Sequence, residues 1–338
     1  MFKYKVGMYG GCFDPLHLGH INCILQASAM CEELHIMLSW SRTRDRIDVR
    51  LRHRWLHEIC KHLPNITIHL VEDVSPSKEQ YDWEGGASNI RGILGRIDIV
   101  FAGSDYQNTT IFQDLYPHSK IWYFSRSTTP ISSTEIFDNP MKYWDYIPKV
   151  AQSYFCKKVL IVGGESTGKS TLVRNLALAY NTTYVEEYGR YTCERAGGED
   201  FMTVEDLQEN IVMQRANIYK AQENANKVLF VDTDALTTAF YADLLSVYEN
   251  NEWYKINDLA YNIANTVQWD LVLFLEPTVP FVQDGTRSEE IMHSRQKYSD
   301  MLKAFYDRAG MRYICIHSED YASRLAQAKK IVSDQCGV

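Results

Sequence analysis

Short apolar runs alternate with longer amphipathic stretches along the whole chain. The runs are typical of strands buried in a sheet, and they predict strands at residues 5–9, 34–39, 66–71, 97–102, 120–124, 158–162, 228–232, 271–275 and 313–316. Between them, apolar residues recur three and four apart, most clearly over residues 204–224 and 289–308, which predicts helices. Strands that alternate with helices predict an α/β fold with mainly parallel sheets.

A seam interrupts this pattern near the middle of the chain. Residues 138–148 contain an Asp-Asn pair and two prolines, which favour turns. The length of 338 residues also exceeds what one hydrophobic core usually organises. We therefore predict two different domains, residues 1–150 and residues 151–338.

Composition and charge narrow the class of protein. Hydrophobic content is 45%, and no apolar run approaches the roughly 20 residues of a membrane span, which predicts no membrane insertion. A net charge of -8 disfavours nucleic acid as a partner. The 8 cysteines lack zinc or C-x-x-C spacing, and no signal peptide is visible. Free thiols and a cytoplasmic location are therefore expected.

The first candidate site follows the strand at residues 5–9. Gly10 and Gly11 leave room for ATP phosphates to approach the main chain, and a helix that starts after them offers free amide donors. His17 and His20 project to one side of a helical turn, where both can hydrogen-bond an α-phosphate as charge builds on it. The pattern G-x-F-x-P-x-H-x-G-H thus predicts ATP contacts at both glycines and at Phe13, with the two histidines as catalytic residues.

This pattern resembles the signature of the H-x-G-H nucleotidyltransferase superfamily, whose members transfer an adenylyl or cytidylyl group. The resemblance implies a Rossmann-like domain in which a substrate phosphate attacks the α-phosphorus of ATP and pyrophosphate leaves. Ser132, Ser133 and Thr134 resemble the helix start that binds the β- and γ-phosphates in that superfamily, although the same residues are good helix caps.

The chain departs from these relatives at Phe137, where they usually carry an arginine that meets the ATP phosphates. Adenylyl transfer is therefore expected to be weak unless another arginine substitutes. Arg126 and the arginines of residues 42–46 are candidates. The wider basic tract, residues 42–54, is interpreted either as a solvated helix face or as a wall that meets phosphates.

The second candidate site follows the strand at residues 158–162. Residues 163–170 fit the phosphate-binding loop (P-loop) pattern G-x-x-x-x-G-K-S without a mismatch. Lys169 would bridge the β and γ oxygens, and Ser170 and Asp232 would hold Mg²⁺, while Asp234 or Asp232 could instead cap the next helix. The predicted ATP contacts form one continuous segment: Gly163, Gly164, Glu165, Ser166, Thr167, Gly168, Lys169, Ser170 and Thr171.

A P-loop by itself does not distinguish a kinase from an ATPase or a GTPase. Glu187 stands where small-molecule kinases carry the acid that accepts the proton of the substrate hydroxyl. Arg287 would close over the phosphates, and Arg190 would support either the nucleotide or the substrate. Surface ion pairing is the alternative for both arginines.

Together these elements resemble the bifunctional NadR family over almost the whole chain. The resemblance is carried by residues 187–190, 232–234 and 284–288 and by the seam at residues 138–147. It implies a nicotinamide-nucleotide adenylyltransferase joined to a P-loop ribosylnicotinamide kinase, both using ATP and Mg²⁺. Nicotinamide riboside would be phosphorylated to the mononucleotide and then adenylylated to NAD. The helix-turn-helix repressor domain that some relatives carry before the first motif is not expected here.

Under this resemblance, four side chains are candidate substrate contacts: Trp83, Tyr188, Arg190 and Asp234. Trp83, in a loop after a strand, could stack on the flat pyridine, although a core position suits it equally. Two other interpretations remain, a fusion that makes coenzyme A and an amino-terminal domain that only senses nucleotides. A homo-oligomer is also left open.

Overall fold

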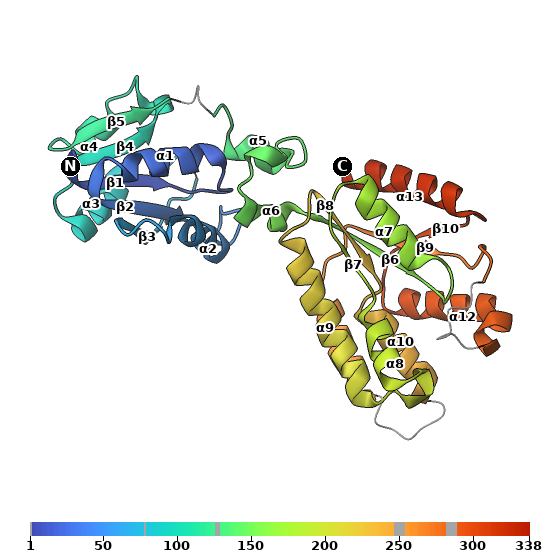
Figure 1. Cartoon of the computed structure of the whole chain (residues 1–338). Coiled ribbons are helices and arrows are strands. Elements are labelled where there is room, and N and C mark those ends of the chain that lie inside the picture. The colour runs from blue at the N-terminus through green and yellow to red at the C-terminus, as the bar shows by residue number, and fades with distance from the viewer. Residues whose placement is uncertain (1, 78, 126–128, 247–253, 282–288) are drawn as a thin grey trace. The chain divides into compact units, whose positions relative to one another are not determined.

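Two compact units, Met1–Gln152 and Ser153–Val338, make up the chain. The structure, a computed structural model shown in Figure 1, describes residues 2–77, 79–125, 129–246, 254–281 and 289–338. The units divide inside α6 (Lys149–Phe155), a helix that the sequence pattern did not predict. Within the described ranges, no helix is both long and apolar enough to cross a bilayer.

The first unit is built on a five-stranded parallel sheet in the order β3-β2-β1-β4-β5. Its strands are β1 (Tyr4–Gly11), β2 (Cys31–Trp40), β3 (Ile66–Glu72), β4 (Ile99–Gly103) and β5 (Lys120–Phe124). Its helices are α1 (Leu18–Ser28), α2 (Val49–Cys60), α3 (Trp83–Leu94), α4 (Ile111–Leu115) and α5 (Ser133–Asp138). The strand order reverses between β1 and β4, and open parallel sheets bind ligands at such a point, outside the carboxyl ends of the strands.

The second unit has a five-stranded parallel sheet in the order β10-β9-β6-β8-β7. Its strands are β6 (Lys157–Gly163), β7 (Tyr184–Val185), β8 (Val228–Asp232), β9 (Leu271–Leu275) and β10 (Ile314–Ile316). Its helices are α7 (Lys169–Ala179), α8 (Tyr188–Ala196), α9 (Val204–Gln222), α10 (Ala235–Ser246), α11 (Tyr254–Ala264), α12 (Glu289–Arg308) and α13 (Tyr321–Cys336). The strand that carries the P-loop, β6, lies in the middle of the sheet.

Both sheets are covered on their faces by helices, as apolar parallel strands require. In the first unit, α3 and α4 pack through Ala87 and Leu115 against Met8, Met37 and Val100 of the sheet. In the second unit, α7 and α13 lie side by side over one face (Figure 1) and share a core with β6, β8 and β9. These cores hold the ends of β1 and β6 in place.

The structure confirms the α/β class and the predicted strands, with ends shifted by at most a few residues. It also confirms helices at α9 and α12. The pattern gave no range for β7, because a two-residue strand is too short to show a period of two.

Candidate active sites

His17 and His20 form a stacked pair at the start of α1. Their ring centroids lie 3.7 Å apart, and the ring planes are inclined by 21°. Nδ1 of His17, the N-cap residue, accepts a hydrogen bond of 3.3 Å from the main-chain N–H of His20. Because Nδ1 is an acceptor here, a neutral His17 carries its proton on Nε2. The pair therefore offers imidazole donors at the end of β1, where the strand order reverses.

Neighbouring residues fix the position of this pair. A Cβ on Gly19 would lie 2.9 Å from the His17 ring, so a larger residue would displace that ring. Phe13 lies edge-on to His20, with ring centroids 4.9 Å apart, and its side chain is 1% exposed. The sequence predicted Phe13 as an ATP contact, but the whole residue is buried in this structure. A Cβ built on Gly10 would lie 3.9 Å from Sδ of Met8 and 4.0 Å from Cβ of Met37, which are ordinary packing distances.

The predicted phosphate-binding helix start is α5. Ser132 is its N-cap and forms a capping box with Glu135, so the capping alternative holds for this residue. Ser133 Oγ donates to the carbonyl of Pro15 at 2.9 Å, which ties α5 to the histidine motif. Thr134 is exposed. The hydroxyl of Ser132 thus caps α5, and that of Ser133 binds the Pro15 carbonyl.

The loop after β2 is also tied to the histidine motif. Asp14 accepts hydrogen bonds from the main-chain N–H groups of Arg46, at 2.8 Å, and Ile47, at 3.1 Å. Arg52 is 0% exposed and donates to the carbonyls of Cys12, Ile47 and Ser39. The solvated-face interpretation of the basic tract is therefore wrong for Arg52.

Arg46 lies over Phe137, the residue that replaces the expected arginine. Its guanidinium carbon is 4.6 Å from the centre of the Phe137 ring, and its Nη1 is 3.6 Å from Oδ1 of Asp138. A cation is therefore present beside position 137 even though that position is not itself basic. The other candidate, Arg126, lies outside the described residues.

Trp83 is the first residue of α3 rather than part of a loop, which corrects the sequence prediction. Asp82 caps this helix by accepting from the N–H of Gly85, and the cap draws Trp83 into the helix. The Trp83 ring is half-buried and lies edge-on to Tyr81, Tyr106 and Phe112. It belongs to an aromatic cluster next to the core.

The P-loop joins β6 to α7 and contains two glycines at which any side chain would be strained. A Cβ on Gly163 would lie 2.6 Å from the Leu275 carbonyl oxygen, and one on Gly168 would lie 2.8 Å from the Tyr321 ring. Both glycines have positive φ angles, 148° and 84°. Lys169 is 9% exposed, and its Nζ donates to the carbonyl of Gly164 at 3.1 Å. The remaining predicted contacts lie along the same loop, with Thr167 buried, Glu165 half-buried and Thr171 exposed.

Ser170 and Asp232 meet in the structure as the sequence predicts for a metal pair. Ser170 Oγ donates to Oδ2 of Asp232 at 2.6 Å. Asp232 is 0% exposed, and burial together with the Glu187 carboxylate raises its pKa to about 6, against the lowering effect of Lys169. Its Oδ1 has no hydrogen-bond partner among the described residues. A hydroxyl beside a buried carboxylate with a bare oxygen fits Mg²⁺, which prefers such oxygen ligands.

Glu187 and its neighbours lie at the start of α8, near Asp232. Glu187 precedes the helix and is half-buried, and its charge acts on Asp232, as does that of Arg190. Gln214 of α9 accepts from the N–H of Tyr188 at 2.9 Å and donates to the carbonyl of Asp232 at 2.8 Å. The Tyr188 hydroxyl is engaged with Glu209 at 2.8 Å, and this bond raises its pKa. Gln214 thus links the start of α8, next to the candidate base Glu187, to the end of β8, which carries Asp232.

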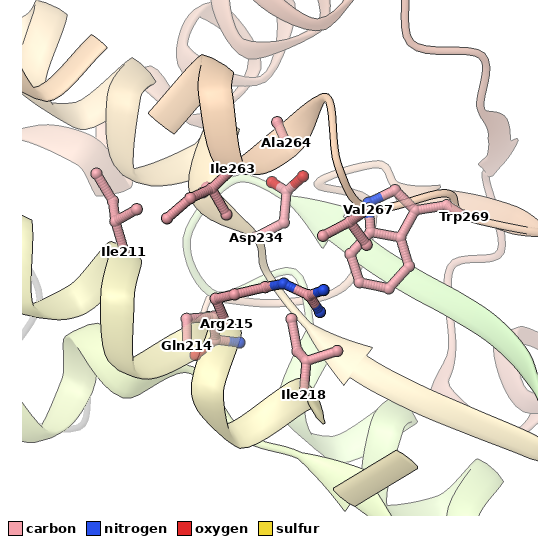
Figure 2. Close-up of a pocket in the computed structure, with 10 residues that line it drawn as sticks. Ile211, Gln214, Arg215, Ile218, Asp234, Ile263, Ala264, Val267 and Trp269 are labelled. Carbon is pink, nitrogen blue, oxygen red and sulfur yellow. The ribbon is translucent and has the colours of Figure 1, made fainter. Parts of the chain in front are cut away.

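Asp234 is buried in a small pocket between α9, α10 and residues 263–269 (Figure 2). Its Oδ1 accepts from the Tyr306 hydroxyl at 2.6 Å and from the N–H of Thr237 at 3.2 Å, which caps the first turn of α10. Burial raises its pKa. Of the two acids, Asp234 therefore serves the cap and Asp232 faces Ser170. Arg287 lies outside the described residues.

Comparisons with known proteins agree with this division into two sites. The family profile described as "Cytidylyltransferase-like" matches residues 8–174, and that described as "AAA domain" matches residues 158–324. The "Trifunctional NAD biosynthesis/regulator protein NadR" of Escherichia coli (strain K12) is 30% identical over 352 residues, covering 99% of this chain and 84% of that protein. The chain belongs to the NadR family.

The chain is similar to a second NadR protein, to a solved NadR structure and, over its first part, to an adenylyltransferase. The NadR protein of Salmonella typhimurium is also 30% identical, over 98% of this chain and 84% of its own length. A crystal structure of NadR protein in complex with NR has the same fold, with a TM-score of 0.83 at 24% identity, covering 100% of this chain and 97% of that one. A phosphopantetheine adenylyltransferase of Streptococcus pneumoniae is 28% identical over 34% of this chain and 74% of its own length.

Sequence reasoning missed two residues that support the second site. Gln214 and Arg324 are both buried and donate to main-chain carbonyls of its loops. A polar residue within an apolar helical pattern was the only signal for them, and it does not say which carbonyl the side chain meets.

Proposed function

We propose that the chain makes NAD from nicotinamide riboside in two ATP-dependent steps. The second unit phosphorylates the riboside to nicotinamide mononucleotide, and the first unit transfers an adenylyl group from a second ATP to that product. One observation carries the proposal: a stacked histidine pair and a P-loop with a buried Ser170–Asp232 pair occur together in a member of the NadR family.

In the kinase step, Glu187 accepts the proton of the riboside hydroxyl, whose oxygen attacks the γ-phosphorus of ATP while ADP leaves. Lys169 and the main-chain N–H groups of the P-loop bind the phosphates. Ser170 and Asp232 would hold Mg²⁺, which would neutralise charge on the phosphate oxygens. Arg287 would close over the phosphates, and Arg190 would support either the nucleotide or the substrate. Tyr188 and Asp234 stay predicted substrate contacts, although here the Tyr188 hydroxyl bonds Glu209 and Asp234 caps α10.

In the adenylyl transfer step, the phosphate of the mononucleotide attacks the α-phosphorus of ATP and pyrophosphate leaves. His17 and His20 donate hydrogen bonds to the α-phosphate oxygens, where negative charge grows in the transition state. Gly10 and Gly11 give the phosphates access to the main chain. Ser132, Ser133 and Thr134 lie at the helix start proposed for the β- and γ-phosphates. Trp83 is the proposed pyridine contact, with one edge of its ring held by the aromatic cluster.

Arg46 is the proposed substitute for the arginine missing at position 137. Asp14 holds its main chain next to the histidine motif, and its guanidinium lies over Phe137. This arrangement favours an enzyme over a nucleotide sensor, because the site retains a cation for the phosphates. We expect Arg46→Ala to lower NAD formation from the mononucleotide and leave mononucleotide formation unchanged.

The reactants, nicotinamide riboside, nicotinamide mononucleotide, ATP and NAD, are small molecules found in the cytoplasm, where the free cysteines of the chain also fit.

The test is product analysis after incubation of the chain with nicotinamide riboside, ATP and Mg²⁺. NAD as the end product supports both steps. Mononucleotide alone contradicts the adenylyl transfer step, and neither product contradicts the choice of substrate.

A further inference from the structure

Arg324 of α13 is buried beside the P-loop, with 1% of its surface exposed. Its Nη1 donates to the carbonyl of Thr167 in the P-loop. The two hydrogens of its Nη2 are shared among three acceptors: the carbonyl of Glu276 at 3.0 Å, Oγ1 of Thr278 at 2.8 Å and the carbonyl of Ser318 at 2.9 Å. All four acceptors are neutral.

These acceptors belong to three loops that follow the neighbouring strands β6, β9 and β10. One guanidinium thus joins the loops that surround the phosphate end of the sheet. Arginine is suited to this because its planar group presents five donors in fixed directions. Lysine concentrates its donors at one point, and glutamine has only two.

A second arginine acts on the adjacent peptide. Nη2 of Arg295, in α12, donates to the carbonyl of Ser166 at 3.0 Å, and its Nη1 donates to the carbonyl of Val279 at 2.9 Å. The carbonyls of Ser166 and Thr167, which are consecutive in the P-loop, are therefore each held by a guanidinium from a different helix.

Because the peptide bond is planar, these two hydrogen-bonded carbonyls also determine the direction of the N–H groups in the P-loop. In a trans peptide the carbonyl and the following N–H point in opposite directions. Holding the Ser166 and Thr167 carbonyls toward the arginines therefore directs the N–H groups of Thr167 and Gly168 the other way. Ser166 and Gly168 have left-handed φ angles of 54° and 84°, and consecutive N–H groups in such a segment form a concave anion site.

We propose that Arg324, assisted by Arg295, is a positioning residue for ATP in the second unit. It contacts the P-loop on the side of the Thr167 carbonyl, and it orients the N–H groups that bind the β- and γ-phosphates. The inference rests on the proposed kinase activity of this unit. It goes beyond that activity by assigning nucleotide affinity to two arginines outside the P-loop motif.

The test compares Arg324→Gln and Arg324→Lys with the unchanged full chain. In the kinase reaction, we expect the KM for ATP to rise about tenfold or more in both variants, because misdirected N–H groups bind phosphate poorly. The KM for nicotinamide riboside and the rate of adenylyl transfer by the first unit should not change. Lys330→Gln is the matched control, since Lys330 is an exposed cation on the same helix.

Chemical rescue separates positioning from a merely structural role. Guanidinium or methylguanidinium ions added to Arg324→Ala should lower the KM for ATP, whereas they should not change that of Lys330→Gln. If Arg324 variants do not fold, Thr278→Val removes one of the four acceptors, and we expect it to raise the KM for ATP alone. Folded Arg324→Gln with an unchanged KM for ATP, or a lower melting temperature as its sole defect, overturns the proposal.

Nucleotide binding keeps this test independent of the substrate assignment. Calorimetry with ADP, without any riboside, measures the P-loop site directly, and the site of the first unit is the same in every variant. If the unchanged chain forms no mononucleotide, the proposed substrate is wrong. The ratio of ADP affinities between the unchanged chain and Arg324→Gln still supports or overturns the role of Arg324.

Discussion

Gly19 and Gly163 show how a missing side chain positions a reactive group at the scale of single residues. A Cβ on Gly19 would meet the His17 ring at 2.9 Å, and one on Gly163 would meet the Leu275 carbonyl at 2.6 Å. Both contacts are too close for real atoms. These glycines therefore fix the ring of His17, a proposed catalytic residue, and the start of the P-loop by close approach.

We expect Gly19→Ala to lower adenylyl transfer by about 10²-fold, because it moves a ring that must meet developing charge. Mononucleotide formation by the second unit should be unchanged. Gly92→Ala is the matched control: no atom lies within 4 Å of its built Cβ, and it is exposed within α3. That change should stabilise α3 by up to about 1 kcal/mol and leave both rates unaffected. Equal activity of the two variants would contradict the proposed role of His17.

The two buried acids of the second unit allow a direct comparison. Asp232→Asn removes a charged ligand from the proposed metal pair, and we expect mononucleotide formation to fall by about 10²- to 10³-fold. Asp234→Asn keeps an oxygen for Tyr306 and Thr237, so the loss should stay within about tenfold. Steady-state rates at several Mg²⁺ concentrations check both. If Asp234→Asn is the more damaging change, the assignment of the metal ligand is wrong.

At the scale of elements, two adjacent strands of the first unit are joined by a hydrogen bond between two histidines outside the candidate site. Nδ1 of His35, in β2, lies 3.0 Å from Nε2 of His69, in β3. Burial and the neighbouring His69 ring lower the pKa of His35, and burial lowers that of His69. A pKa below the unfolded value means that the unfolded chain binds protons first as the pH falls.

The first unit should therefore lose stability as the pH falls from about 7 through the lowered values of this pair, and change little from this source above that range. Hydrogen exchange of β2 and β3, corrected for the intrinsic effect of pH, measures the opening free energy. His69→Gln should flatten the profile. His62→Gln, at an exposed position, should not. A profile that His69→Gln leaves unchanged would remove the pair from this explanation.

At the scale of the whole molecule, each unit has its own sheet, core and candidate site. We expect Lys169→Met to abolish mononucleotide formation and His17→Ala to abolish NAD formation from the mononucleotide. An equal mixture of the two variants should convert nicotinamide riboside to NAD, because free mononucleotide passes from one molecule to the other. Product analysis over time checks this, and failure of the mixture, with each remaining activity intact, would contradict independent sites.

The order of neighbouring residues along the chain was enough to predict most strands and both nucleotide-binding motifs. The fully buried strands β8 and β9 are nearly continuous apolar runs and match their predicted ranges. Glycine, lysine and serine at fixed spacing identify the P-loop for a local reason, since one turn must approach the phosphates. The same holds for His17 and His20, which a single helical turn brings together.

Only the tertiary structure decided which distant groups meet. Arg46 lies over Phe137, and Trp83 lies at the start of a helix. Asp232, and not Asp234, accepts the hydrogen bond from Ser170. The tertiary structure also brought Arg324 to the P-loop across 157 positions of sequence. The sequence alone determined the strands, the motifs and the two-part α/β plan, because these depend on residues close together in the chain. Contacts between loops depend on sheet order and side-chain direction, which no local pattern encodes.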